Sequence, residues 1–380
     1  MRPLQFQKTI LNWFDQHGRK HLPWQQDKTP YRVWISEIML QQTQVNTVIP
    51  YYEQFMQRFP SLKALAQASV DDVLHSWAGL GYYSRARNLH RAAKWILEEV
   101  NGIFPDNIAD LMQLPGIGRS TAGAILSIAF GKKAPILDGN VKRVLSRFAG
   151  IDEPVNDKTT ENKLWALAER YTPEKRVDHY TQAIMDLGAT LCTRSKPQCG
   201  TCPLGKNCYA YRMGMADLLP KKKSARTLPV RAAAFLILRN KGRILLHKRP
   251  ETGIWGGLWS LPEIPGKPDE GKIREYCRRQ LRHPIACYQP LEPFRHTFSH
   301  YHLDIHPVIV TIRPSHRPAL DTEMEAGMQI WYNPREAKAV GLPKPIQLLL
   351  RGLDDQNHTM RKTAQRSGRT RPASASRRAG

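Results

Sequence analysis

The chain has 380 residues, with 57 Lys or Arg against 33 Asp or Glu, and therefore a formal net charge of +24. A chain this basic attracts polyanions, so nucleic acid is the leading candidate partner and acidic membrane lipid the second. No apolar run approaches the roughly 18 residues that cross a bilayer, and the N-terminus lacks the apolar centre of a signal peptide. We therefore expect a cytoplasmic protein without membrane association.

The first part of the chain, residues 1–216, is predicted to form an all-helical domain. Apolar residues recur at helical spacing over Tyr31–Val45, and another helix is expected over Gly118–Ala129. Ser69 precedes Asp72 by three residues, which is typical of a capping box at the start of a short helix. Few stretches alternate with a period of two, so strands are not expected here.

The composition changes after this domain, and residues 217–230 predict a basic linker. Residues 231–350 predict a smaller α+β domain. Its strands are expected at Arg231–Arg239, Gly242–Lys248 and Leu303–Ile312, and its helix between Glu270 and Arg282. The tail, residues 351–380, is rich in Arg, Ser and Ala and has no acid from Arg361 onward, so we expect it to be disordered.

A glycine turn that leads into a helix occurs at Leu114-Pro115-Gly116-Ile117-Gly118. Free N–H groups at a helix start bind phosphate, so Gly116 and Gly118 are candidate contacts to a DNA backbone. The alternative is an ordinary turn between two helices.

An acidic residue, Asp138, stands before Gly139 and a basic segment with Lys142 and Arg143. Taken alone, such an aspartate is more often the cap of the helix that follows it. The two basic residues could hold backbone phosphates.

Four of the six cysteines fall within seventeen positions, at Cys192, Cys199, Cys202 and Cys208. Clustered thiols in an intracellular protein indicate metal binding rather than disulfides. A four-thiolate zinc site usually has two Cys-x-x-Cys pairs, and only one is present here. The spacing matches the [4Fe–4S] loop of endonuclease III-like glycosylases, one of several known cluster spacings.

These motifs together resemble a known superfamily. The glycine turn resembles the helix-hairpin-helix of DNA glycosylases, and with Asp138 and the cysteine loop it places the first domain in the endonuclease III superfamily. Glu37 and the Leu-Gln-Gln-Thr sequence after it narrow the resemblance to MutY-type adenine DNA glycosylases. The segments at 79–86, 253–259 and 298–300 fit the same family, so the resemblance covers nearly all of residues 1–350.

The resemblance implies excision of adenine through an oxocarbenium-like sugar. Glu37 matches the general acid that protonates N7 of adenine, and burial among apolar residues would raise its pKa as that role requires. Asp138 matches the carboxylate that stabilises the cation or bonds to it transiently, and Asn140 matches a residue that assists at this site. Further matched positions insert at the lesion (Gln42 and Tyr82) or line the adenine pocket (Trp24, Gln25 and Gln182).

Ser120 occupies the position where lyase members of the superfamily have a lysine. A hydroxyl cannot form a Schiff base, so we expect base excision without efficient strand cleavage.

The second domain resembles a Nudix module. Its helix keeps Arg274 and Glu275 but has Arg278 and Arg279 where a Nudix enzyme has carboxylates, so pyrophosphate hydrolysis is not expected. The family assigns recognition of 8-oxoguanine to the loop that Phe298, Ser299 and His300 match.

Three hypotheses follow. The favoured one is a monomeric adenine glycosylase that acts on A:8-oxoguanine or A:G mispairs in double-stranded DNA, with the [4Fe–4S] cluster as its only cofactor. An endonuclease III-type enzyme that removes oxidised pyrimidines and nicks DNA is disfavoured by Ser120 and by the added domain. A DNA-binding protein without activity is disfavoured because both Glu37 and Asp138 are present.

Overall fold

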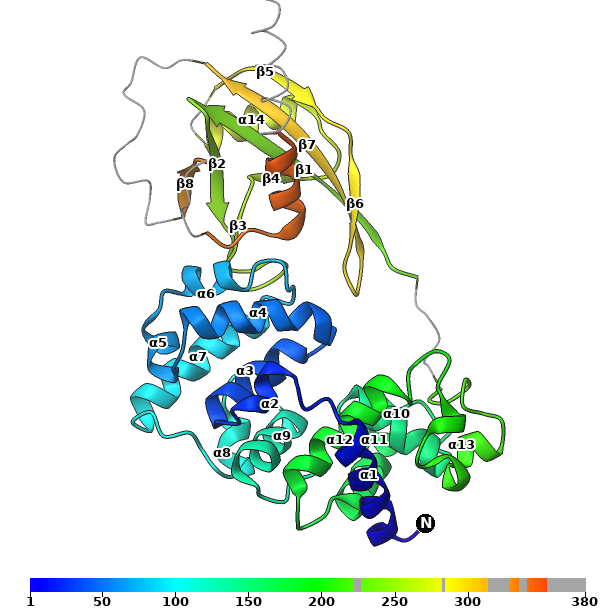
Figure 1. Ribbon diagram of the computed structural model, residues 1–380. Coiled ribbons are helices and arrows are strands. Elements are labelled where there is room, and N and C mark those ends of the chain that lie inside the picture. Colours follow the sequence, from blue (N-terminus) through cyan, green and yellow to red (C-terminus); the bar gives the residue numbers. More distant parts are fainter. Residues whose placement is uncertain (222–226, 282–283, 314–327, 335–339, 354–380) are drawn as a thin grey trace, which may run out of the picture. The chain divides into compact units, whose positions relative to one another are not determined.

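The computed structural model describes residues 1–221, 227–281, 284–313, 328–334 and 340–353. The chain divides into two compact units, Met1–Arg226 and Thr227–Gly380 (Figure 1). Residues 222–226 of the expected linker, residue 282 of the expected helix and residues 354–380 of the expected tail lie outside the described residues. In the part that is described, no helix is long and apolar enough to cross a membrane.

In its described residues the first unit has helices and connecting loops but no strands, which confirms the predicted all-helical domain. Its elements are α1 (Pro3–His17), α2 (Pro23–Gln26), α3 (Pro30–Leu40), α4 (Val45–Arg58), α5 (Leu62–Gln67), α6 (Val70–Ser76), α7 (Ser84–Glu99), α8 (Ile108–Gln113), α9 (Arg119–Phe130), α10 (Gly139–Ala149), α11 (Lys158–Tyr171), α12 (Val177–Thr190), the 3₁₀ turns η1 (Cys199–Thr201) and η2 (Gly205–Asn207), and α13 (Tyr209–Arg212). Ser69 caps α6 by accepting from Asp72 N at 3.1 Å, as predicted.

Helix α3 has a start that is encoded locally. The Thr29 hydroxyl accepts from Arg32 N at 3.3 Å, and Pro30 is the first helical residue. The prediction of one helix over Tyr31–Val45 is wrong, because the chain leaves the helix after Leu40 and begins α4 at Val45. Gln42, in the intervening turn, has a φ of 58°. A residue in this left-handed region cannot continue a right-handed helix.

The glycine turn joins α8 to α9 as predicted. Gly116 has a φ of 83°, and a Cβ there would lie 2.9 Å from Asn88 Cβ, so a larger residue would be both strained and crowded. Helix α9 then packs against α3 and α12, and α12 packs against α10. This packing brings the middle of α3, the start of α9 and the start of α10 together.

In its described residues the second unit is a mixed sheet with two helices, which agrees with the predicted Nudix-like domain. Its elements are β1 (Val230–Asn240), β2 (Arg243–Lys248), β3 (Trp259–Ser260), β4 (Glu263–Pro265), α14 (Glu270–Arg279), β5 (Ile285–Pro290), β6 (Phe294–Thr297), β7 (His302–Ile312) and β8 (Gln329–Tyr332). The central order is β3-β2-β1-β7-β5, with β1 and β7 parallel and the other pairs antiparallel. Residues 344–353 form a further helix.

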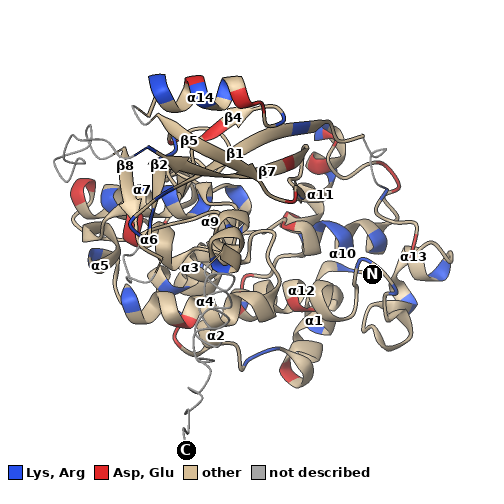
Figure 2. Cartoon of the chain, turned by 90° about the horizontal axis from the view of Figure 1, so that it is seen from above, with Lys and Arg blue, Asp and Glu red and all other residues tan. Residues whose placement is uncertain are grey.

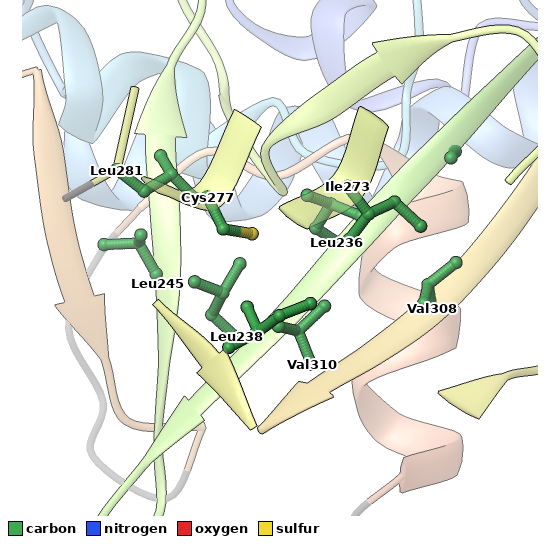
Figure 3. Packing of buried hydrophobic residues seen from close by; sticks show 10 residues of the cluster. Leu236, Leu238, Leu245, Ile273, Cys277, Leu281, Val308 and Val310 are labelled. Atoms are coloured by element: carbon green, nitrogen blue, oxygen red, sulfur yellow. The ribbon is translucent and has the colours of Figure 1, made fainter. Parts of the chain in front are cut away.

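The core of this unit lies between the sheet and α14 (Figure 3). Leu236 and Leu238 of β1 are the register partners of Val308 and Val310 of β7, so the four side chains share one face. Cys277 of α14 is fully buried against the same cluster. A residue in the helix where a Nudix enzyme binds metal therefore serves packing in this chain.

Candidate active site

A cavity of about 310 Å³ gathers most of the predicted site residues of the first unit. This volume is at the small end of the range for ligand pockets. Of the predicted residues, the cavity is lined by Trp24, Glu37, Ser120, Asp138, Asn140 and Gln182. They come from α2, α3, α9, α10 and α12 and from the segment just before α10, so helix packing assembles them from distant parts of the sequence.

Glu37 is partly buried on α3 and lines the cavity together with Asp138. Burial raises the pKa of Glu37 to about 8, and the negative charge of Asp138 adds to this rise. A carboxyl with this pKa keeps its proton at neutral pH and can donate it. The sequence prediction that burial would raise the pKa of Glu37 agrees with this environment.

Asp138 is the N-cap of α10 as well as a wall of the cavity. Its Oδ1 accepts from Val141 N at 2.7 Å, and Asn140 Nδ2 donates to Oδ2 at 3.2 Å. Burial raises the pKa of Asp138, while these donors and the nearby Arg143 guanidinium lower it in part. The capping interpretation and the catalytic one therefore apply to the same carboxylate, because the cap fixes where it points.

Arg143 connects this cap to the cysteine loop. Its Nη2 donates to Asn140 Oδ1 and to Gly188 O, each at 2.8 Å, and its Nε donates to Cys192 O at 2.7 Å. A chain of hydrogen bonds thus runs from Cys192 through Arg143 and Asn140 to Asp138. A phosphate contact by Arg143 stays a prediction, and most N–H groups of its guanidinium already bind protein acceptors.

The wall formed by α12 contains residues that the sequence did not reveal. Gln182 Nε2 donates to Asp186 Oδ1 at 2.8 Å, and Gln25 Nε2 donates to Gln182 Oε1. Asp186 is fully buried and accepts from Arg19 through its backbone N at 2.8 Å, Nε at 3.0 Å and Nη2 at 2.7 Å. A carboxylate only accepts hydrogen bonds, so the Nε2 group of Gln182 faces Asp186. The Oε1 atom of Gln182 therefore points away from Asp186. The sequence signal that could have revealed Asp186 is its spacing from Gln182, one helical turn away on α12.

Ser120 lies at the start of α9 and borders the cavity. Its Oγ accepts from Leu137 N at 3.0 Å. The hydroxyl thereby holds the residue just before Asp138. A lysine at this position could not make the same bond, because an ammonium group does not accept hydrogen bonds.

Gln42 and Tyr82 lie outside the cavity on two exposed turns. Both have left-handed backbone, with φ of 58° at Gln42 and 49° at Tyr82, and the Tyr82 side chain is 49% exposed. The chain thus presents an amide and an aromatic ring to solvent from two turns. Lys142, a predicted phosphate contact, donates to Glu161 at 2.6 Å, so a phosphate would have to replace that carboxylate.

The four clustered cysteines lie at the end of α12 and around η1 and η2. Burial is the main cause that raises the pKa of Cys199, Cys202 and Cys208. Negative charge on the neighbouring cysteine thiolates raises it further, because the four side chains lie near one another. Arg147, which is buried, donates to Cys192 Sγ at 3.3 Å. Over the described ranges, no group of three or more His, Cys, Asp or Glu side chains is arranged for a single metal ion.

The predicted recognition residues of the second unit form the turn between β6 and β7. Phe298 N donates to Tyr301 O at 2.9 Å, and the Phe298 ring packs on Trp255 and Tyr301 with centroids 5.4 and 4.8 Å apart. Ser299 and His300 are exposed. The turn therefore presents two polar side chains from an aromatic base.

Helix α14 carries both basic and acidic residues along its length (Figure 2). Arg274 binds Glu270 at 2.8 Å, and Arg279 binds Glu275 at 3.1 Å. Both glutamates of this helix are thus neutralised by arginines. The observation supports the expectation that this helix does not bind the divalent ions of a Nudix hydrolase.

The helical fold with its glycine hairpin, and a cavity that holds two carboxyl groups, fit the class of DNA glycosylases. Two known domain families match this chain, and the first of them agrees with this class. Residues 35–170 match the HhH-GPD superfamily of base excision DNA repair proteins, and residues 233–352 match the NUDIX domain.

Similar proteins narrow this class. The adenine DNA glycosylase of Buchnera aphidicola subsp. Acyrthosiphon pisum (strain APS) is 42% identical over 91% of this chain and 96% of that protein. The adenine DNA glycosylase of Homo sapiens is 36% identical over 78% of this chain and 65% of that protein. A solved structure of a thermostable thymine-DNA glycosylase, 28% identical, covers 56% of this chain and 97% of its own with a TM-score of 0.51. The chain belongs to the adenine DNA glycosylase family.

Proposed function

We propose that this protein hydrolyses the N-glycosyl bond of adenine mispaired with 8-oxoguanine or guanine in double-stranded DNA. It acts as a monomer in the cytoplasm and leaves an abasic site without efficient strand cleavage. The observation that carries the proposal is the placement of Glu37 and Asp138 on one cavity, with the pKa of Glu37 raised to about 8.

The two carboxyl groups have different roles in the proposed reaction. Glu37, protonated at neutral pH, donates its proton to N7 of the departing adenine and then helps to activate water. Asp138, oriented by Val141 N and Asn140, supplies negative charge to the developing sugar cation. Adenine reaches these groups only after it is flipped out of the duplex.

The polar wall of the cavity suits adenine. Because Gln182 Nε2 donates to Asp186, the Gln182 oxygen is directed to the Gln25 side, where it accepts a hydrogen bond from Gln25 Nε2 and is suited to accept one from the amino group of a base. Adenine carries an exocyclic amino group where guanine carries a carbonyl oxygen. The arrangement supports Gln25 and Gln182 as base-recognition residues, with Trp24 as the apolar wall.

Hydrolysis without a lyase step is supported by Ser120, which has no amine. Its hydroxyl is occupied by Leu137 N, and the endonuclease III-type alternative requires a lysine nucleophile. That alternative also lacks support from the curated relatives reported above, which are named for adenine.

Cys192, Cys199, Cys202 and Cys208 would hold a [4Fe–4S] cluster. Four neighbouring thiols with the buried Arg147 cation against Cys192 suit thiolate ligation, and a four-iron cluster separates its ligands further than one ion does. When bound, the cluster would supply a fixed cross-link of the loop. No step of the proposed reaction passes through it.

The Phe298–His300 turn of the second unit is proposed to read 8-oxoguanine. Exposed Ser299 and His300 can exchange hydrogen bonds with the oxidised base edge, while Phe298 is held by Trp255 and Tyr301. The glycine hairpin, with Gly116 and Gly118, and Lys142 are proposed as contacts to the DNA backbone.

The substitution Asp138→Asn tests the proposed chemistry. Asparagine caps a helix as well as aspartate does, so α10 should keep its start while the full negative charge is lost. We expect single-turnover excision to fall by about 10²-fold to 10³-fold while binding to the mismatched duplex is retained. Asp138→Ala, which removes both cap and charge, is the comparison for instability. Normal excision by Asp138→Asn would refute the role.

A further inference from the structure

Arg85 is a buried cation at the start of α7. It is 8% exposed, and its Nη1 donates to Ile38 O at 2.8 Å and to Met39 O at 2.9 Å. The same nitrogen donates to Gln41 O. These three carbonyls belong to the C-terminal end of α3, where the helix leaves carbonyl groups without helical partners. Arg85 thus ends the helix that carries Glu37.

The second terminal nitrogen of Arg85 reaches two further groups. Nη2 donates to Thr43 Oγ1 at 3.2 Å and to Gly81 O at 3.3 Å. The guanidinium also lies over the rings of Trp77 and Tyr82, each with the centroid 5.4 Å away. One side chain therefore connects the turn after α3 to the turn before α7.

The charge of Arg85 is balanced by dipoles and rings. Among the hydrogen bonds of the described residues, each acceptor of this guanidinium is a carbonyl or a hydroxyl oxygen. The C-terminal end of a helix carries partial negative charge that stabilises a cation. Burial lowers the pKa of Arg85 to about 10, so it remains charged at neutral pH. A planar fork with several donors suits this set of acceptors, and a lysine ammonium does not.

Arg85 brackets the two residues with left-handed backbone. It binds Gln41 and Thr43 on either side of Gln42, and Gly81 just before Tyr82. Non-glycine residues in this conformation persist only where surrounding contacts impose it. The hydrogen bonds of Arg85 supply such contacts to both turns at once.

We propose that Arg85 is a positioning residue that holds the Gln42 and Tyr82 turns in the conformation that inserts into DNA. The inference rests on the proposed function, in which these residues fill the gap left by the flipped adenine. Arg85 itself is not among the described residues that line the cavity, although its partners Gln41 and Thr43 are. The proposal assigns Arg85 to base extrusion, and the test below separates this role from an effect on bond cleavage. Tight positioning matters because small misplacements slow a reaction strongly.

The test compares two duplexes in single-turnover excision, one with adenine opposite 8-oxoguanine and one with adenine opposite an abasic-site analogue. An adenine without a pairing partner is easier to extrude. We expect Arg85→Lys to slow excision from the paired substrate at least about tenfold and to slow the unpaired one much less. Arg91→Lys, an exposed position on the same helix, is the control and should match the unmodified chain on both substrates.

Equal slowing on both substrates would overturn the proposal, because it would mean that Arg85 acts by placing Glu37 on α3. Unchanged excision of the paired substrate would also overturn it. Failure of the unmodified chain on both substrates would instead refute the proposed function, so the two failures are distinguishable.

A double-mutant cycle with Tyr82→Ala gives a second measurement. If Arg85 acts through Tyr82, the pair Arg85→Lys and Tyr82→Ala should lose little more activity than Tyr82→Ala alone. Fully additive losses would contradict the proposal. Thr43→Val removes one hydrogen-bond acceptor of Arg85 with little change in side-chain volume. It can replace Arg85→Lys in the same double-mutant cycle if Arg85→Lys fails to fold.

Discussion

Glu37 and Asp138 line the same cavity, and burial raises the pKa of both, but their other surroundings differ. Glu37 is desolvated and repelled by Asp138, whereas Asp138 receives hydrogen bonds from Val141 N and Asn140 and lies near Arg143. Of the two carboxyls, Asp138 has the surroundings that favour its charged form, because donors and a guanidinium oppose the effect of burial. Two neighbouring carboxyl groups in different surroundings are suited to acid and charge-stabilising roles.

The raised pKa of Glu37 predicts a pH-dependent penalty on stability. Between the ordinary glutamate pKa of about 4.5 and about 8, the folded state binds a proton that the unfolded state has released. The free energy of unfolding should therefore decline as pH rises through this window. Glu37→Gln removes this decline in the free energy of unfolding, because glutamine has no carboxyl group to ionise. We expect the variant to gain in Tm relative to the unmodified chain from pH 5 to pH 8, as measured by thermal unfolding.

Glu98→Gln, at an exposed position of α7, is the matched control and should leave the two Tm curves parallel. Parallel curves for Glu37→Gln as well would show that the carboxyl is already ionised in the folded protein. That result would remove Glu37 from the role of acid.

Motifs predicted Glu37 and Asp138 of the cavity, but not the residues that hold the surrounding side chains in place. Glu37 and Asp138 stand in local patterns that can be read along the chain. Asp186 and Arg19 do not, because their pairing joins α12 to the loop after α1 and exists only after folding. Arg85 is similar, since its acceptors lie in a different helix and turn.

At the scale of elements, the sequence predicted where helices begin better than where they end. Thr29, Ser69 and Asp138 cap the helices that follow them through bonds to residues three positions on. The end of α3 has no such local signal, because Gln41 and Gln42 are compatible with a helix. Helix α3 ends where its last carbonyl groups accept hydrogen bonds from Arg85. Arg85 belongs to another helix, so this end depends on tertiary structure.

The turn between β6 and β7 carries a prediction of its own. Replacement of both Phe298 and Ser299 by Ala removes the aromatic anchor on Trp255 and the exposed hydroxyl. We expect the preference for 8-oxoguanine over guanine opposite adenine to fall about tenfold, since a good polar contact to a base gives roughly 1–3 kcal/mol of discrimination. Competition binding with the two duplexes measures it.

A matched control for this turn is Thr297→Ala, whose exposed hydroxyl contacts His302 of the neighbouring strand. It should retain the preference. If the double variant also retains it, the turn does not read the opposite base and the proposed role is wrong.

At the scale of the whole molecule, composition indicated the partner and the residue patterns indicated two domains. The +24 charge favoured nucleic acid, and the change from helical to alternating periodicity marked the second unit. Its first predicted strand, Arg231–Arg239, agrees within one residue at each end with β1. The parallel pairing of β1 with β7 could not be predicted from local periodicity, because it joins strands far apart in the chain.

Adenine excision without strand cleavage can be tested on three labelled DNA duplexes. End-labelled duplexes with adenine opposite 8-oxoguanine, cytosine opposite 8-oxoguanine, or thymine glycol opposite adenine are incubated with the protein and analysed with and without hot alkali. We predict breaks at the adenine opposite 8-oxoguanine, and only after alkali. Breaks at thymine glycol without alkali would contradict the account and favour an endonuclease III-type enzyme.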